Sequence, residues 1–301
     1  MTTVSPVPSP SLRALVAGLV DYAGLFPPAM LSMTEAVARY ASYRDSGDAW
    51  MLARFIVPVV RLDELAAGAA PYLASTGSPW RLSALVGDDA AAEADCIRSF
   101  NRSHAGRLVV DVAEVKAASV ERIDLVSRAL GAALTVYVEL PHAADPRALL
   151  EAVRRTGARA KIRTGGVTAD AFPSARQLAR FIARCAQLGV PFKATAGLHH
   201  PLRGEYRLTY QPDSPVATMF GFLNAFAAGV LALAGMSEDA LVDVLEERRI
   251  TSFSFAADGL RWRSHMVTLE QLAWARASFA IAFGSCSFRE PVDDLQELAR
   301  L

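Results

Sequence analysis

Residues 134–163, LTVYVELPHAADPRALLEAVRRTGARAKIR, decide the fold of this chain. Two apolar runs, Leu134–Leu140 and Ala158–Arg163, are predicted strands, and the segment between them is helix-like. Asp145 is a plausible N-cap for that helix, with Pro146 at its first position. A strand, a helix and a second strand within about 30 residues form a βαβ unit, whose two strands lie parallel in one sheet.

The same alternation of apolar runs and helix-like segments continues along most of the chain. The other predicted strands are Arg54–Val60, Arg81–Val86, Arg107–Val112, Pro191–Thr195, Ile250–Phe255 and Phe279–Phe283. Eight strands alternating with helices predict an α/β fold of the TIM type, a (β/α)8 barrel. A doubly wound open sheet is the alternative, and it would bring the same strand ends to a ligand crevice.

We expect a flexible leader at residues 1–11 and a single barrel domain over residues 12–301. Leu12–Val20 and Thr34–Tyr43 are predicted helices that form an N-terminal extension. The segment between them, DYAGLFPPA (residues 21–29), either covers the bottom of the barrel or folds over its mouth. FAADGLRWR (residues 255–263) is a candidate β-hairpin with an Asp-Gly turn.

Composition limits the partners of the chain. The 31 basic and 31 acidic residues balance, so we expect neither nucleic acid nor a membrane surface as a partner. Residues 215–237 carry no charge, but Asn224 near their middle favours a buried helix over a membrane span. Widely spaced cysteines and the absence of a signal-peptide pattern predict a cytoplasmic protein. A homo-oligomer is compatible with this sequence.

Lysine usage points to the chemistry. Lys116, Lys161 and Lys193 are the three lysines among 31 basic residues, and each lies in or just after a predicted strand. Lysine can act as a base or a Schiff-base nucleophile, which arginine cannot do. In a parallel barrel the catalytic groups lie at the carboxyl ends of the strands, where these lysines fall. We therefore expect at least one of them to have a chemical role.

The predicted strand ends form a cationic pocket. The period of two places Lys161 and Arg163 on one face of their strand, and Lys193 and Thr195 on one face of the next. With Glu139 as a partner, such crowding is expected to depress the pKa of a lysine. The alternative is a structural ion-pair network, for example between Glu139 and Lys161, that fills the barrel.

The strand ends and the loops after them supply the remaining candidates for the site. The predicted substrate-binding or anion-binding residues are Arg163, Thr164, Gly165, Gly166, Thr195, Arg203, Ser285 and Cys286. The adjacent His199 and His200 do not have the spacing of metal ligands, so we expect them to orient substrate or move protons, and we expect no metal site.

Four segments, DYAGLFPPA, KIRTGG, FKATAGLHHP and FGSCSFREPVDDL, together resemble the signature segments of a group of uncharacterised bacterial barrel proteins. A local similarity links KIRTGG and FKATAG to class I aldolases of the deoxyribose-phosphate aldolase type. Those enzymes carry two barrel lysines, one forming an imine and the other tuning it, and the similarity would assign these roles to Lys161 and Lys193. The sequence departs from that pattern because Gly-Gly follows the first lysine, Arg163 intervenes, and the histidine pair has no counterpart.

The leading hypothesis is that the chain is an aldolase-like lyase, which acts on a small carbonyl compound bearing a carboxylate or phosphate. Lys193 would be the nucleophile, Lys161 would lower its pKa, Glu139 or a loop histidine would move protons, and no cofactor would be needed. One alternative is a transferase resembling phosphoribosyltransferases, in which the same cluster holds phosphates with Mg²⁺. The other is a metabolite-binding barrel without catalysis.

Overall fold

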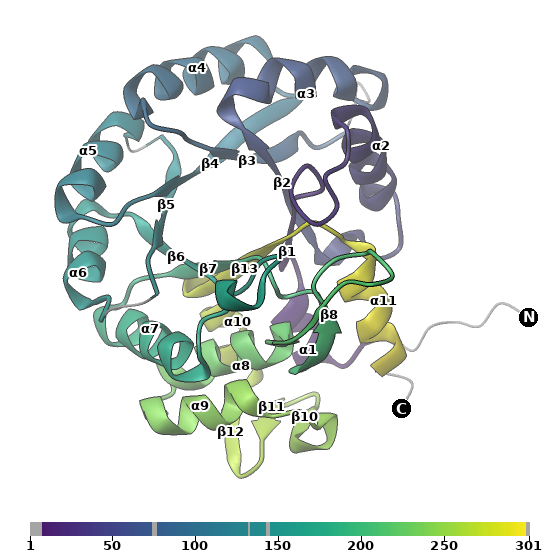
Figure 1. Ribbon diagram of the computed structural model, residues 1–301, viewed down its shortest axis with the longest axis vertical. Coiled ribbons are helices and arrows are strands. Elements are labelled where there is room, and N and C mark those ends of the chain that lie inside the picture. The colour runs from purple at the N-terminus through teal and green to yellow at the C-terminus, as the bar shows by residue number, and fades with distance from the viewer. Residues whose placement is uncertain (1–7, 74–76, 132, 143–144, 299–301) are drawn as a thin grey trace, which may run out of the picture.

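The computed structural model describes residues 8–73, 77–131, 133–142 and 145–298. Eight parallel strands close into a barrel with helices around it, as Figure 1 shows. In order around the barrel, the strands are β1 (Val20–Tyr22), β2 (Leu52–Pro58), β3 (Trp80–Leu85), β4 (Leu108–Lys116), β5 (Thr135–Leu140), β6 (Arg159–Arg163), β7 (Phe192–Thr195) and β13 (Ala280–Ser285). The chain is a (β/α)8-barrel protein, and the open-sheet alternative is wrong.

Helices surround the barrel, most of them in a single outer layer (Figure 1). In chain order they are α1 (Pro10–Val16), α2 (Met33–Arg44), α3 (Leu62–Ala69), α4 (Ala90–Ser103), α5 (Val120–Leu130), α6 (Arg147–Thr156), α7 (Ala175–Leu188), α8 (Phe222–Leu233), α9 (Glu238–Glu246), α10 (Leu269–Ser278) and α11 (Arg289–Leu298). Ser174 caps α7 in a capping box with Gln177. Pro146 is the N-cap of α6, and Asp145 accepts a hydrogen bond from the amide of Arg147, so the predicted cap is displaced by one residue.

Seven of the predicted strands lie in the barrel, and the eighth prediction is wrong. Residues 250–255 instead contain a 3₁₀ turn and β10 (Phe253–Phe255), which joins β11 (Gly259–Trp262) and β12 (His265–Thr268) in a separate antiparallel sheet. The predicted hairpin at residues 255–263 is thus present between β10 and β11. The remaining barrel strand is β1, which begins at the last residue of the predicted helix Leu12–Val20 and continues into the DYAGLFPPA segment. It pairs in parallel with β13 and β2 and closes the barrel.

The N-terminal extension is shorter than predicted. Helix α1 precedes the barrel and packs against α10, whereas α2 follows β1 and is the helix of the first βα unit. Helix α1 begins at Pro10, with Ser9 as its N-cap, so the predicted leader does not reach residue 11. Residues 1–7 of that leader lie outside the described part of the chain.

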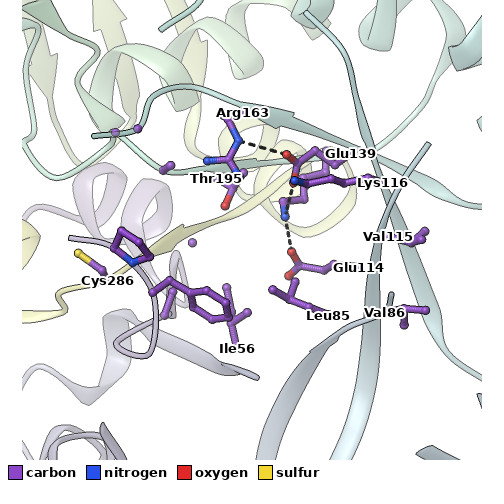
Figure 2. Close-up of a pocket in the computed structure, with 18 of the residues that line it drawn as sticks. Ile56, Leu85, Val86, Glu114, Val115, Lys116, Glu139, Arg163, Thr195 and Cys286 are labelled. Carbon is purple, nitrogen blue, oxygen red and sulfur yellow. Dashed lines mark hydrogen bonds and ion pairs between the residues drawn. The ribbon is translucent and has the colours of Figure 1, made fainter. Parts of the chain in front are cut away.

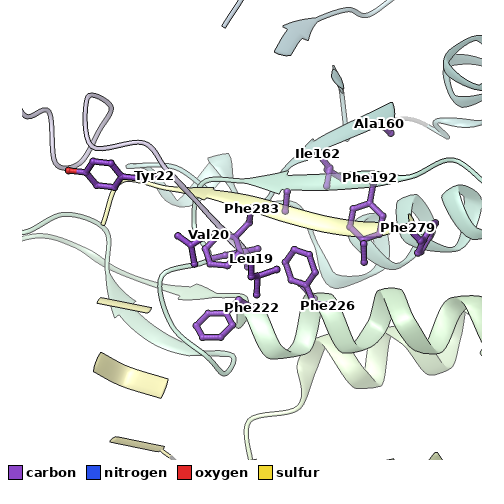
Figure 3. Packing of buried hydrophobic residues seen from close by; sticks show 14 of the residues in the cluster. Leu19, Val20, Tyr22, Ala160, Ile162, Phe192, Phe222, Phe226, Phe279 and Phe283 are labelled. Atoms are coloured by element: carbon purple, nitrogen blue, oxygen red, sulfur yellow. The ribbon is translucent and has the colours of Figure 1, made fainter. Parts of the chain in front are cut away.

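Phenylalanines pack two barrel strands against helix α8, which belongs to the long segment between β7 and β13. Phe192 of β7 stacks near Phe226 of α8, and Phe222 of α8 stacks on Phe283 of β13 (Figure 3). Helix α8 is the uncharged segment identified in the sequence, and all but one of its residues are buried. Within the described residues, the helices are too short or too polar to cross a membrane. This packing fixes β7 and β13, two of the strands that position the site.

A second insertion lies at the barrel mouth between β7 and α8. It contains the two-stranded antiparallel sheet of β8 (Gly204–Arg207) and β9 (Val216–Met219). In Figure 1 this hairpin lies beside α11. The hairpin therefore stands next to the loops that follow β7 and β13.

Candidate active site

A cavity of about 580 Å³ opens at the carboxyl ends of the barrel strands. Its wall is built from the last residues of β2 to β7 and from Gly284 of β13, together with the loops that follow them (Figure 2). Ala23, Phe26, Pro27 and Pro28, which follow β1, also line it. The segment DYAGLFPPA thus supplies both a barrel strand and part of the mouth, and does not cover the bottom.

Lys161 lies in the cavity wall between two carboxylates. Its Nζ is 2.7 Å from Glu114 Oε2 and 2.7 Å from Glu139 Oε2. Glu139 also contacts Arg163, whose Nε is 3.2 Å from Oε1. The parallel register brings these side chains together, because Glu139 of β5 pairs with Lys161 of β6, and β4 adjoins β5. Lys161 is 5 % exposed and is nevertheless one of the residues that line the cavity.

Lys193 lies beneath this layer, and the cavity-lining residues do not include it. Its Nζ is 2.6 Å from Glu114 Oε1 and donates a second bond to Asp21 of β1. The ring of Tyr137 lies 5.4 Å from the ammonium group. Glu114 therefore bridges the two lysines, with one carboxylate oxygen on each.

The buried charges keep one another ionised. Burial alone would raise the pKa of Glu114, but the ammonium groups of Lys161 and Lys193 hold the pKa far below its ordinary value. Burial also opposes the charge on Lys193, yet Asp21 and Glu114 raise its pKa above the ordinary value. The predicted depression of a lysine pKa is thus wrong for Lys193, because each like charge is separated from the next by a carboxylate.

Cations also stand around the cavity. Arg163 is half-buried, Lys116 at the end of β4 is exposed, and Arg122 of α5 donates to the carbonyls of Gly87 and Asp88. All three line the cavity. An anionic group of a small molecule would find complementary charge here.

The glycine loop after β6 packs against the loop after β7. A Cβ on Gly165 would lie 2.7 Å from the Cα of Gly197, so only glycine fits this approach. The amide of Thr164 donates to the carbonyl of Thr195, and its hydroxyl donates to that of Ala196. Both donors of Thr164 are thus already used, and Thr164 is not among the residues that line the cavity. Gly166 and Thr195 do line the cavity, whereas Gly165 is not one of its lining residues.

Two other predicted binding residues lie away from the cavity wall. Arg203 packs over Phe220, its backbone amide donates to Asn224, and Glu246 is its nearest charged partner at 4.0 Å. Ser285 is buried, and its hydroxyl accepts from the amide of Ser287. The structure thus does not bring Arg203 and Ser285 to the cavity with the other predicted residues, since each contacts its own local structure.

Each of the two histidines contacts a carboxylate of α11. His199 Nδ1 is 2.9 Å from Glu290 Oε2, and His200 Nδ1 is 2.5 Å from Asp294 Oδ2. His199 lines the cavity. Cys286 also lines it, and burial raises the pKa of this thiol to about 11, so it is protonated at neutral pH. Within the described residues, His, Cys, Asp and Glu side chains do not group in threes as a metal site would require.

Asp21 and Glu114 are functional candidates that the predicted site omits. Each is an acidic residue inside an apolar strand, and each is at most 2 % exposed. A carboxylate in a buried strand needs a cationic partner in the lumen. An acidic residue within an apolar strand was therefore the sequence signal that could have identified these two residues. The position of Asp21 was hidden because β1 has three residues and was not recognised as a strand, whereas Glu114 lies in β4 beyond the predicted end of that strand at Val112.

Comparisons with known proteins find a distant likeness alone. No family model matches the sequence, and no curated protein matches it. Among solved structures, the chain is similar to dihydropteroate synthase from Xanthomonas albilineans in complex with 7,8-dihydropteroate, at 13% identity and a TM-score of 0.40 over 95% of this chain and 94% of that one. The same enzyme with 4-aminobenzoic acid gives 14% identity and a TM-score of 0.40 over 95% and 93%. The family of the chain is not defined by these matches.

Proposed function

We propose that the chain is an enzyme that forms a Schiff base between Lys161 and a small carbonyl compound bearing a carboxylate or phosphate. The observation that carries this proposal is the position of Lys161, in the cavity wall with Glu114 and Glu139 on its amine and Arg163 two residues further along β6. A nucleophile, two proton acceptors and an anion-binding group thus meet in one cavity.

Geometry favours Lys161 over Lys193 as the nucleophile, which reverses the roles expected from the sequence. Lys193 lies below the cavity floor and is held by Asp21 and Glu114, so a substrate carbonyl does not reach it without displacing Lys161. Lys193 instead fixes Glu114, whose other oxygen contacts Lys161. The local similarity to class I aldolases supports the same pair of lysines.

The reaction would begin with transfer of a proton from the Lys161 ammonium group to Glu139 or Glu114. The neutral amine attacks the carbonyl carbon, and the carbonyl oxygen takes up a proton to give a carbinolamine. Loss of water then leaves an iminium ion. Electrons from an adjacent carbon–carbon bond can flow into this iminium ion and form an enamine, which is the chemistry that makes aldol cleavage accessible.

Arg163 and Lys116 would bind the anionic group of the substrate. Arg163 is the better candidate, because its guanidinium lies beside Lys161 and offers paired donors to a carboxylate or phosphate. Its Nε already contacts Glu139, so a bound anion would draw Arg163 from Glu139 and leave that carboxylate to accept the proton of Lys161.

Borohydride trapping tests this proposal. The protein is incubated with a panel of small aldehydes and keto acids, reduced, digested and analysed by mass spectrometry. We expect one stable adduct on Lys161, absent in Lys161→Met. Lys116→Met, which removes an anion-binding candidate of the same cavity, should slow the labelling without moving the adduct away from Lys161. An adduct confined to Lys116 or Lys193, or none with any compound, would refute it.

A second candidate function uses the same charges without covalent chemistry. The raised pKa of Lys193 and the pairing of Lys161 with two carboxylates mean that the cluster can act as fixed positive charge toward a sugar phosphate. This function predicts Mg²⁺-dependent binding of a sugar phosphate, measured by calorimetry, and no borohydride adduct.

A further inference from the structure

A second cavity of about 570 Å³ adjoins the first under the β8–β9 hairpin. Pro28, Gly166, Gly197 and His199 line both cavities, so the two meet at the loops after β6 and β7. This second cavity lies on the side of His199 away from Lys161 and its carboxylates, which line the first cavity alone.

Side chains of the second cavity suit a flat apolar group. Leu208 and Met219 are buried in its wall at 4 % and 3 % exposure. The ring of Tyr206 stacks on that of His200 with their centroids 3.5 Å apart, and Tyr210 also lines this cavity. The guanidinium of Arg207 donates to the carbonyl of Pro212, so this cation already has a partner.

A hydrogen-bonded chain stands where the cavities meet. Glu290 Oε2 is 2.9 Å from His199 Nδ1 and accepts a bond of 3.2 Å from the hydroxyl of Tyr210, which is 3.5 Å from Cys286 Sγ. Although burial opposes it, the bond with His199 lowers the pKa of Glu290. With Glu290 as the acceptor of the Nδ1–H bond, Nε2 is the nitrogen of His199 that can take up a proton.

From this arrangement we infer that the second cavity is the subsite for the aldehyde half of a β-hydroxy carbonyl substrate with a ring-sized apolar substituent. His199, positioned by Glu290, is the base for the substrate hydroxyl. This inference rests on the proposed imine at Lys161 and names the substrate class of that site. The carbonyl half of the substrate lies in the first cavity and the aldehyde half in the second, so the bond that breaks lies where the two cavities meet.

With the carbonyl carbon bound to Lys161 as an iminium ion, Nε2 of His199 takes the proton of the β-hydroxyl group. The oxygen forms a carbonyl, the carbon–carbon bond breaks, and its electron pair moves into the iminium ion to give a neutral enamine. The aldehyde remains in the second cavity. The enamine carbon is then protonated by His199, and water hydrolyses the resulting imine.

The test uses two probe substrates that differ in one substituent. They are the aldol of pyruvate and benzaldehyde and the aldol of pyruvate and acetaldehyde. We expect Leu208→Trp, which fills the second cavity, to lower kcat/KM for the phenyl substrate at least tenfold relative to the methyl substrate. Val216→Trp, on the exposed face of the same hairpin, is the matched control and should change neither. Equal loss for both substrates, or no loss, would overturn the inference.

Glu290→Gln tests the base. General-base catalysis typically contributes about 100-fold or more to a rate, so we expect kcat for both substrates to fall by about this factor. KM and borohydride trapping of pyruvate on Lys161 should stay unchanged, and Glu290→Asp should restore part of kcat. A parallel loss of trapping would show that Glu290 acts on the fold and would overturn its role at His199.

Failure of the inference can be separated from failure of the proposed function. Binding of benzyl alcohol to Lys161→Met, followed by nuclear magnetic resonance, needs no imine. We expect binding that Tyr206→Ala and Leu208→Trp each weaken at least fivefold. Saturable binding without trapping in the wild type would retain the subsite and reject the Schiff base. Trapping without binding would retain the Schiff base and reject the subsite.

Discussion

Replacement of Lys193 by methionine is predicted to remove the cation that neutralises the floor of the site. The side chain is 1 % exposed and contacts Asp21 and Glu114, both carboxylates in the barrel lumen. Methionine has a similar length and no charge, so the variant leaves the packing largely intact. Glu114 keeps Lys161 as a partner, whereas Asp21 loses its ammonium group.

The size of the effect follows from burial. Removing one member of a buried ion pair typically costs about 3–5 kcal/mol, because the remaining charge is left uncompensated. For 301 residues and an unfolding entropy of about 2.1 cal/mol/K per residue, the loss corresponds to a fall of about 5–8 °C in the midpoint of thermal unfolding.

The loss is expected to depend on pH. Glu114 has a lowered pKa in the folded protein, so its ion pairs contribute stability above its ordinary pKa of 4.5, and this contribution disappears as the pH falls toward the folded-state pKa. Removing Lys193 takes away one of the two cations that lower this pKa. The difference between wild type and variant should therefore be largest near neutral pH and should shrink as the pH falls below about 4.

Urea unfolding at neutral and acidic pH checks the prediction. Lys116→Met serves as the matched control, because Lys116 is exposed and its replacement should change the free energy of unfolding by less than about 0.5 kcal/mol. A loss below about 1 kcal/mol for Lys193→Met, or a loss that does not vary with pH, would refute the proposed electrostatic role of Lys193.

Two further predictions concern the loops at the barrel mouth. Gly165→Ala would force a Cβ to within 2.7 Å of the backbone of Gly197 and should cost about 1–3 kcal/mol in urea unfolding; a cost near zero would contradict the close packing of the two loops. Cys286, with its pKa raised to about 11, should react with iodoacetamide at neutral pH far more slowly than the exposed Cys96; equal alkylation rates by mass spectrometry would contradict its burial.

Strand prediction from sequence succeeded where apolar runs were long. It failed for β1, which was not predicted, and for residues 250–255, which were predicted to lie in the barrel and do not. β1 is three residues long and contains Asp21, so it has no apolar run and becomes a strand through its partners β13 and β2. Residues 250–255 have the apolar pattern of a barrel strand, but pair with β11 through a short hairpin. Periodicity describes which faces are buried, and it cannot tell which neighbour a strand will find.

The candidate site was predictable to the extent that strand ends converge. The period of two placed Lys161 and Arg163 on one face, and the structure brings both to the cavity with Glu139. The order of the two lysines along the barrel axis was not predictable, because it depends on the stagger of neighbouring strands. Arg203 could not be placed from sequence either, since its backbone amide is held by the side chain of Asn224 in helix α8.

The charged lumen itself supports a chemical role over a structural one. Barrel interiors are commonly filled by layers of branched apolar side chains, and such packing is often at least as stabilising as a buried ion network of the same volume. Here Asp21 and Lys193 lie beneath Lys161 and Glu114, which line the cavity. A purely space-filling ion network would not require one buried lysine beneath another lysine that lines a cavity. The arrangement instead fixes one oxygen of Glu114 on Lys193 and presents the other to the lysine that a substrate can reach.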